Sequence, residues 1–149
     1  MRKAIRLSVK SVTDGGGPFA SVIVKNDRII ASGTNRVAID NDPTAHGEVI
    51  AIRNAARELG SFDLSGCDIY TSCEPCPMCL GAIYWARLDN LYYANSKTDA
   101  AGIGFDDSFI YSEFALPAEE RSVNTVQLLR DEALEAFRRW KEKEDRIEY

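Results

Sequence analysis

The pattern of apolar and polar positions predicts short strands alternating with helices along the chain. Basic residues recur at helical intervals in residues 1–12, and the glycines and proline at 15–18 then break that helix. Two runs rich in apolar and β-branched residues, 19–24 and 29–35, flank a polar turn. The two runs therefore predict a β-hairpin that follows an N-terminal helix.

Helical spacing returns after the hairpin. Asp42 followed by Pro43 has the form of an N-cap with proline at the first helical position, and Gly60 ends the run, so we expect a helix over about 44–59. The other predicted elements are strands at 67–72, 91–94 and 123–129, an apolar helix at 76–86 and an amphipathic helix around 134–140. This alternation is typical of a layered α/β domain with a mixed sheet.

Size and charge limit the functions that the chain can have. Its 149 residues fit one domain, 1–149, and its formal net charge of −5 disfavours a protein that mainly binds phosphate backbones. No apolar run approaches the roughly 20 residues of a membrane span, and residues 1–12 lack the apolar core of a signal peptide. We expect a cytoplasmic protein that binds a small molecule, without a membrane partner, a nucleic-acid partner or an organic cofactor.

Three of the four cysteines, Cys73, Cys76 and Cys79, lie at intervals of three residues, which favours metal or redox chemistry over disulfides. Cys76 and Cys79 fall in the first turn of a predicted helix and project to the same side, which suits two thiolate ligands of zinc. His46, near the start of another predicted helix, supplies a third ligand. Three protein ligands leave a fourth position for water, as in catalytic zinc sites.

Glu48 lies two residues after His46. On an ideal helix the two side chains would point about 200° apart, so they can share a metal only if it lies off the helix tip. Two helix N-termini at the metal would favour the thiolate forms of the cysteines. Glu48 would then lie beside the water and carry its proton to a leaving amine.

The same pattern has a non-catalytic interpretation. A Cys-x-x-Cys pair at a helix start also occurs in redox pairs and in structural zinc sites, which need a fourth ligand. Cys73 could be that ligand, beside His46, Cys76 and Cys79. Cys67, at the start of a strand, is expected to be a small buried hydrophobe. A structural zinc module that binds a base or a protein therefore stays open at this point.

The pairing of His-x-Glu at 46–48 with Pro-Cys-x-x-Cys at 75–79 is the signature of zinc-dependent base deaminases. The sequence here resembles the cytidine-deaminase-like superfamily and, within it, the bacterial guanine deaminases. The resemblance covers about residues 15–120, and the stretches that carry it are 16–19, 41–46, 71–87 and 104–111. It implies a three-layer αβα sandwich with a central mixed sheet of about five strands. It also implies one Zn²⁺ per subunit and hydrolysis of guanine to xanthine and ammonia, with Glu48 as the catalytic residue.

The resemblance also implies which residues bind the base. Asn35 would hydrogen-bond the purine, Asp107 would face the guanine edge, and Phe19 and Trp85 would help to wall the pocket. In these enzymes the C-terminal segment, here about 122–149, crosses to a partner in a swapped homodimer, so that the final tyrosine, Tyr149, reaches the partner's site.

The chemistry of guanine agrees with two of these roles. Guanine has an N–H donor at N1 where adenine has an acceptor, so the carboxylate of Asp107 would select guanine, and the amide of Asn35 suits the opposite edge. By sequence alone, Asp107 would more simply be a helix N-terminal carboxylate beside Ser108. The chain departs from the family pattern at Gly47, where alanine is usual, at Ala20, where glycine is usual, and over about 122–148. Guanosine, ammeline, cytosine and adenosine in tRNA remain alternative substrates.

Overall fold

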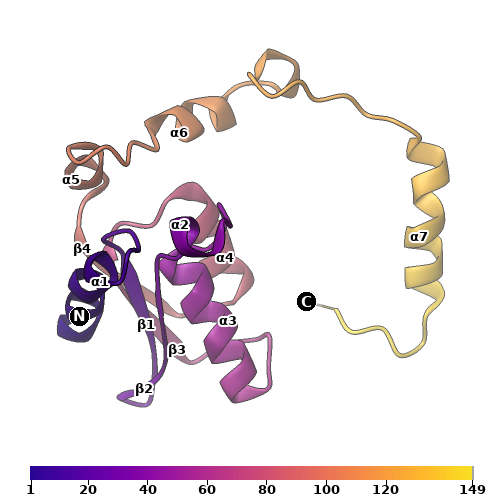
Figure 1. The fold of residues 1–149 in the computed structure, drawn as a ribbon. Coiled ribbons are helices and arrows are strands. Elements are labelled where there is room, and N and C mark those ends of the chain that lie inside the picture. Colours follow the sequence, from indigo (N-terminus) through magenta and orange to yellow (C-terminus); the bar gives the residue numbers. More distant parts are fainter. Residues whose placement is uncertain (149) are drawn as a thin grey trace. The chain divides into compact units, whose positions relative to one another are not determined.

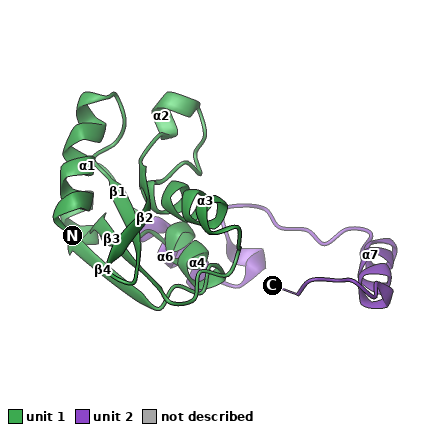
Figure 2. Cartoon of the chain, turned by 90° about the horizontal axis from the view of Figure 1, so that it is seen from below, with its two compact units in different colours: residues 1–107 green, residues 108–149 purple. Residues whose placement is uncertain are grey.

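A computed structural model describes residues 1–148 of the chain in two compact units, 1–107 and 108–148. Figure 2 colours the two units separately. The first unit holds the β-sheet and the helices that cover it, and the second consists of helices joined by extended segments. Tyr149, which the resemblance places at a partner's site, lies outside the described residues.

A mixed sheet forms the centre of the first unit. Its strands are β1 (Ala20–Lys25), β2 (Arg28–Thr34), β3 (Cys67–Cys73) and β4 (Asn90–Asn95), in the order β2-β1-β3-β4. Strand β1 is antiparallel to β2 and β3, whereas β3 and β4 are parallel. The predicted hairpin is confirmed, and its turn places Asn26 and Asp27 at positive φ, which a tight two-residue hairpin turn requires.

Helices cover both faces of this sheet (Figure 1). Helix α1 (Arg2–Thr13) packs on β1 and β3 from one side, and α3 (Gly47–Leu59) and α4 (Pro77–Trp85) lie on the other. The core between the sheet and α3 and α4 contains Ile23, Ile69, Ala51, Ala55, Leu64 and Ile83. Short helices α2 (Val37–Asp40) and α5 (Lys97–Ala101) complete the unit. The mixed αβα architecture implied by the resemblance is therefore confirmed.

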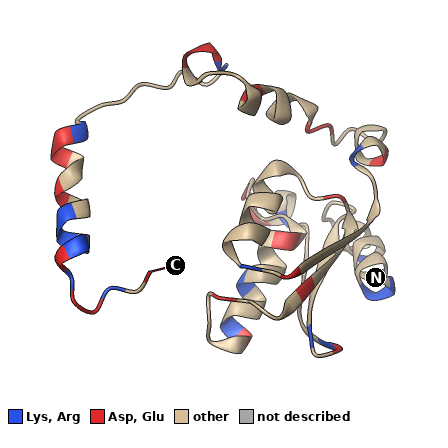
Figure 3. Cartoon of the chain, turned by 180° about the vertical axis from the view of Figure 1, so that it is seen from behind, with Lys and Arg blue, Asp and Glu red and all other residues tan. Residues whose placement is uncertain are grey.

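The second unit differs from the first because it has no buried core among its described residues. It contains α6 (Ser108–Ala115), a 3₁₀ turn at Ala118–Glu120 and α7 (Arg130–Glu142), and none of residues 108–148 is buried. Figure 3 shows acidic and basic residues interspersed along α7. No helix within residues 1–148 combines the length and apolar character needed to cross a membrane.

Two sequence expectations are corrected. The sheet has four strands and not about five, because the segment expected to be a strand at 123–129 forms no ladder with any of the described strands. An apolar run becomes a strand only when a neighbouring strand supplies its hydrogen bonds. Helix α3 begins at Gly47 and not at 44, since the Asp42 carboxylate accepts hydrogen bonds from the backbone N–H and hydroxyl of Thr44 and so stabilises a turn before the helix.

Candidate metal centre and active site

The starts of two helices bring the predicted metal ligands together. His46 is the N-cap residue of α3, and Cys76 is the N-cap residue of α4, whose first helical residue is Pro77. Cys79 follows in the first turn of α4. The two helices therefore direct their N-termini, with their positive dipole ends, to the place where the three side chains meet.

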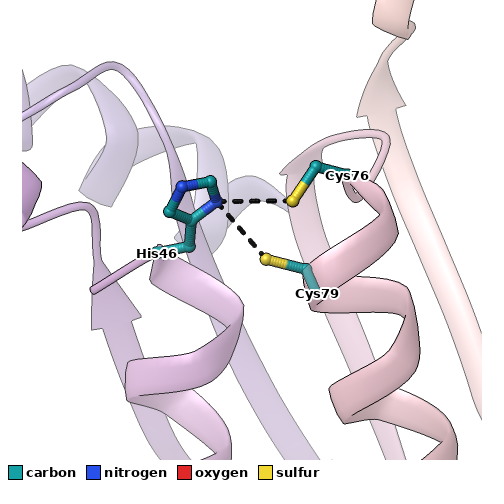
Figure 4. Close-up of side chains that lie close together, drawn as sticks. All are labelled: His46, Cys76 and Cys79. Carbon is teal, nitrogen blue, oxygen red and sulfur yellow. Dashed lines mark hydrogen bonds between the residues drawn. The ribbon is translucent and has the colours of Figure 1, made fainter. Parts of the chain in front are cut away.

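The geometry of this group fits zinc. The Nδ1 atom of His46 lies 3.5 Å from the sulfur of Cys76 and 3.5 Å from the sulfur of Cys79 (Figure 4). A tetrahedral ion with ordinary Zn–N and Zn–S bonds would separate such a nitrogen and sulfur by about 3.6 Å. Among residues 1–148 this is the one group of three or more histidine, cysteine or acidic side chains that is close enough to hold a metal.

Electrostatics favour a thiolate in the group. Hydrogen bonding with the side chain of Cys79, and then with His46, lowers the pKa of Cys76 to about 4. The same pairing with Cys76 raises the pKa of Cys79, and burial raises it further. The hydrogen bond to Cys76 raises the pKa of His46. A cation among these ligands would compensate the charge of two thiolates, so the donor set suits a divalent soft metal.

Cys73 does not join the group. Its thiol donates to the carbonyl oxygen of Ser96 at 3.5 Å, and burial raises its pKa to about 11. The closed site with four protein ligands that the sequence left open is therefore absent from the described residues, where His46, Cys76 and Cys79 stand without a fourth protein ligand. Cys67 is fully buried in the core, as expected for a small hydrophobe.

Glu48 is buried beside the metal ligands. Its side chain is 5% exposed, and its Oε2 atom accepts a hydrogen bond from the Cys79 thiol at 3.3 Å. The hydroxyl of Thr71 donates to Oε1 at 3.0 Å. Burial raises the pKa of Glu48, which brings a carboxyl group toward the range in which it can both take and release a proton near neutral pH. Sequence reasoning missed Thr71, because a threonine inside a β-strand carries no signal of its own.

Asn35 is also buried and has a fixed orientation. The amide oxygen accepts a hydrogen bond from the backbone N–H of Val37 at 3.3 Å, and a side chain at Gly17 would come within 3.0 Å of the same amide. Because the N–H of Val37 is a donor, the atom that faces it is the oxygen, and the NH₂ group points elsewhere.

The remaining predicted site residues among those described are Phe19, Asp107 and Trp85. Phe19 packs edge-to-face on Phe105, with ring centroids 4.9 Å apart. Asp107 is half-buried, and burial, followed by the charge of the Cys76 thiolate, raises its pKa. Trp85 is 67% exposed at the last residue of α4, at the opposite end of that helix from Cys76.

Comparisons with known proteins agree with this site. The family model for the cytidine and deoxycytidylate deaminase zinc-binding region matches residues 1–95. Guanine deaminase from Bacillus subtilis (strain 168) is 53% identical over 100% of this chain and 96% of its own length. The X-ray structure of guanine deaminase from Bacillus subtilis superposes with a TM-score of 0.96 and 53% identity, and the match covers 99% of this chain and 95% of that one. A tRNA-specific adenosine deaminase from Haemophilus influenzae is 38% identical over 72% of this chain and 65% of its own length.

Proposed function

Because the chain belongs to the family of the cytidine and deoxycytidylate deaminase zinc-binding region, we propose that it hydrolyses guanine to xanthine and ammonia. The observation that carries this function is a likeness to a guanine deaminase that extends over the whole chain at 53% identity. The His46, Cys76 and Cys79 group, with a buried carboxylate beside it, supplies the chemistry that the reaction needs.

His46, Cys76 and Cys79 would hold one zinc ion per subunit. When bound, zinc supplies Lewis-acid activation of a water molecule at near-neutral pH. The carboxylate of Glu48 takes a proton from the attacking water as its oxygen bonds to C2 of guanine, and delivers that proton to the adjacent ring nitrogen. Glu48 then moves the second proton, from the new hydroxyl to the amine. The C2–N bond breaks, ammonia leaves and C2 becomes a carbonyl.

Asn35 and Asp107 give the site its preference for guanine. The oxygen of the Asn35 amide is engaged by Val37, so the NH₂ group is the part that meets the base, and it donates to an acceptor such as O6 or N7. The carboxylate of Asp107 accepts from N1–H. Adenine has an acceptor at N1, so it would leave a partly buried carboxylate unpaired, and such unpaired groups exclude the wrong substrate strongly. Phe19 provides an apolar wall for the base, whereas Trp85 lies at the opposite end of α4 from Cys76 and does not fit this role within the same chain.

The working protein is a homodimer in which the C-terminal segment, about 122–149, crosses to the partner and Tyr149 reaches the partner's site. Support comes from the many exposed apolar side chains of the second unit, which a partner would cover: Val123, Val126, Leu128, Leu129, Phe137 and Trp140. A thiolate site with free cysteines also suits a reducing compartment, so we place the protein in the cytoplasm.

The test is release of ammonia, with ultraviolet detection of xanthine, from the zinc-loaded protein. Guanine should be the preferred substrate over guanosine, ammeline, cytosine and adenosine in tRNA. Removal of zinc should abolish turnover. Glu48→Gln should lower kcat by about 10²–10⁴-fold, because the amide cannot carry a proton. Glu58→Gln, at an exposed position of the same helix, is the matched control and should leave kcat unchanged. Turnover by Glu48→Gln at the wild-type rate would refute the mechanism, and faster turnover of another base would correct the substrate.

A further inference from the structure

The catalytic carboxylate has two different hydrogen-bond partners, one on each oxygen. Cys79 Sγ donates to Oε2 of Glu48, and Thr71 Oγ1 donates to Oε1. Thr71 is 1% exposed and lies near the end of β3, the strand that leads to the metal-binding loop. It is not one of the predicted metal ligands and is not part of the proposed base pocket.

The two hydrogen bonds respond differently to metal binding. The bond from Cys79 requires a proton on the sulfur, and a cysteine binds zinc as the thiolate, which has no proton to donate. The hydroxyl of Thr71 keeps its proton under all conditions of interest. Once the metal ligands are engaged, Thr71 is therefore the side chain that still fixes the orientation of the Glu48 carboxylate.

We propose that Thr71 is a positioning residue for the reaction, which holds Oε1 of Glu48 so that Oε2 is the oxygen that carries the proton. This inference rests on the proposed function. With Oε1 bound to the strand, Oε2 remains on the side of the metal ligands, where the water is expected. A carboxylate held by one oxygen needs no reorientation to collect a proton at the water and release it to the base, and such preorganisation is a common source of catalytic rate.

A second buried hydroxyl, that of Ser21, belongs to the residue paired with Thr71 in the sheet. Ser21 on β1 is the direct antiparallel partner of Thr71 in the sheet, so both side chains lie on the face covered by α3. The Ser21 side chain is fully buried, and its Oγ is the one buried side-chain polar atom without a hydrogen-bond partner among the described residues. The Thr71 hydroxyl donates its proton to Glu48, and its oxygen keeps lone pairs that can accept a further hydrogen bond. As the cross-strand neighbour of Thr71, Ser21 would be the donor to that oxygen, so that the two hydroxyls would support Glu48 in series.

The decisive experiment compares Thr71→Val with Thr71→Ser in the zinc-loaded, full-length protein. Valine keeps the shape and removes the hydroxyl, so kcat should fall by roughly 10–100-fold, the usual cost of losing an outer-shell partner. KM for guanine should change by less than about twofold. Thr71→Ser should keep kcat within a few-fold of wild type. Zinc content and zinc affinity, measured by competition with a chromophoric chelator, should match wild type in both variants, because Thr71 does not touch the metal.

Several results would overturn the inference. These are a Thr71→Val protein with wild-type kcat, equal losses in the valine and serine variants, or a valine variant that binds zinc weakly. If Thr71→Val fails to fold, Ser21→Ala decides the matter: it should lower kcat by about two- to fivefold with KM and zinc affinity unchanged, and an unchanged kcat would refute the hydroxyl series. A wild-type protein that releases no ammonia from guanine would instead refute the proposed function. If the protein deaminates another base, the valine and serine variants are compared on that base, with the same expected losses. If it deaminates no base, the proposed role of Thr71 is refuted together with the proposed function.

Discussion

The first 107 residues and the 41 that follow them in the described chain differ in how they bury side chains. Every buried residue lies in the first unit, where Ile23, Ile69 and Ala51 form part of one core. None of residues 108–148 is buried, although Leu128 and Phe137 are among its many apolar residues. The first unit has the means to fold by itself, whereas the second needs a surface that its own residues do not provide.

The chemistry follows the same division. The metal ligands and Glu48 lie in the first unit, on helices whose inner faces contact the sheet. The activity of these side chains depends on close packing that fixes their positions, because a shift of about 1 Å at a catalytic group can lower the rate by about 10²-fold. Substitutions that disturb the packing of the first unit should therefore affect folding, zinc binding and turnover together, and substitutions of exposed apolar residues in the second should act mainly through association.

The largest expected effect on stability comes from Gly33→Ala, which would disturb the packing of the first unit. A Cβ at Gly33 would overlap the carbonyl oxygen of Gly47 and lie 2.5 Å from the nitrogen of Ala51, so the backbone of α3 must move away from β2. We expect a loss of about 1–3 kcal/mol in the free energy of unfolding, typical of overpacking. Displacement of α3 should also weaken zinc binding and lower kcat. Urea unfolding, zinc titration and the guanine assay measure the three effects.

Gly81→Ala is the matched control for this change. Gly81 lies inside α4, at an ordinary helical φ, and a Cβ there would meet no atom within 4 Å. Alanine should therefore stabilise the protein by about 0.5–1 kcal/mol through its higher helix propensity. If Gly33→Ala unfolds at the wild-type urea concentration, α3 is not held as closely as the structure indicates.

Much of the first unit could be predicted from its sequence because local patterns specify it. The hairpin, α1 and α4 follow from residue spacing, and their predicted bounds agree with the structure to within about two residues. The metal ligands were predictable because Cys76, Cys79 and His46 are residue types with a distinctive chemistry. The start of α3 was misplaced because Asp42 can cap either a helix or a turn, and the hydrogen bonds to Thr44 decide between them only in the folded chain.

Interactions between segments that are distant along the chain could not be predicted from the sequence. Nothing in a strand sequence shows that Thr71 will donate to Glu48, since that contact depends on how β3 meets α3. The separation of Cys73 from the metal group likewise depends on the neighbouring carbonyl of Ser96. The expected strand at 123–129 lacked a partner for the same reason, because strand formation is a property of two segments and not of one.

An intermediate effect is expected from Leu128→Gln, which tests whether the second unit acts by association. Leu128 is 76% exposed in the single chain. If a partner covers this side chain, the polar substitution should weaken the dimer by at least about tenfold, because buried apolar anchors dominate interface energies. Zinc content should stay unchanged. Sedimentation velocity over a range of protein concentrations measures the dissociation constant.

Gln127→Ala is the control, since it changes an exposed polar neighbour in the same extended segment. It should leave the dissociation constant at the wild-type value. The comparison between the two units would be wrong if Leu128→Gln sediments as wild type but unfolds at lower urea, because Leu128 would then stabilise the fold of its own chain.

The smallest expected effect is the pH dependence of Asp42→Asn, measured on the metal-free protein. Hydrogen bonds from the hydroxyl and then the backbone N–H of Thr44 lower the pKa of Asp42. A carboxyl group whose pKa is lowered by folding stabilises the fold above its unfolded pKa, near 3.9, and this contribution is lost as the pH falls through the folded pKa. Wild type should therefore melt slightly above Asp42→Asn at pH 7, and the difference should shrink as the pH falls below about 4.

Glu135→Gln is the counterpart in the second unit, where hydrogen bonds from Arg139 and Arg138 lower the pKa of Glu135. The sign of its pH dependence is the same, but Glu135 belongs to a helix with no buried residue. The thermal midpoint of the first unit, followed by the fluorescence of Trp85 in the Trp140→Phe background, should respond to Asp42→Asn and not to Glu135→Gln. If both substitutions changed this midpoint equally, the two units would melt as one cooperative structure. The two units would then differ in how many side chains they bury but not in their stability.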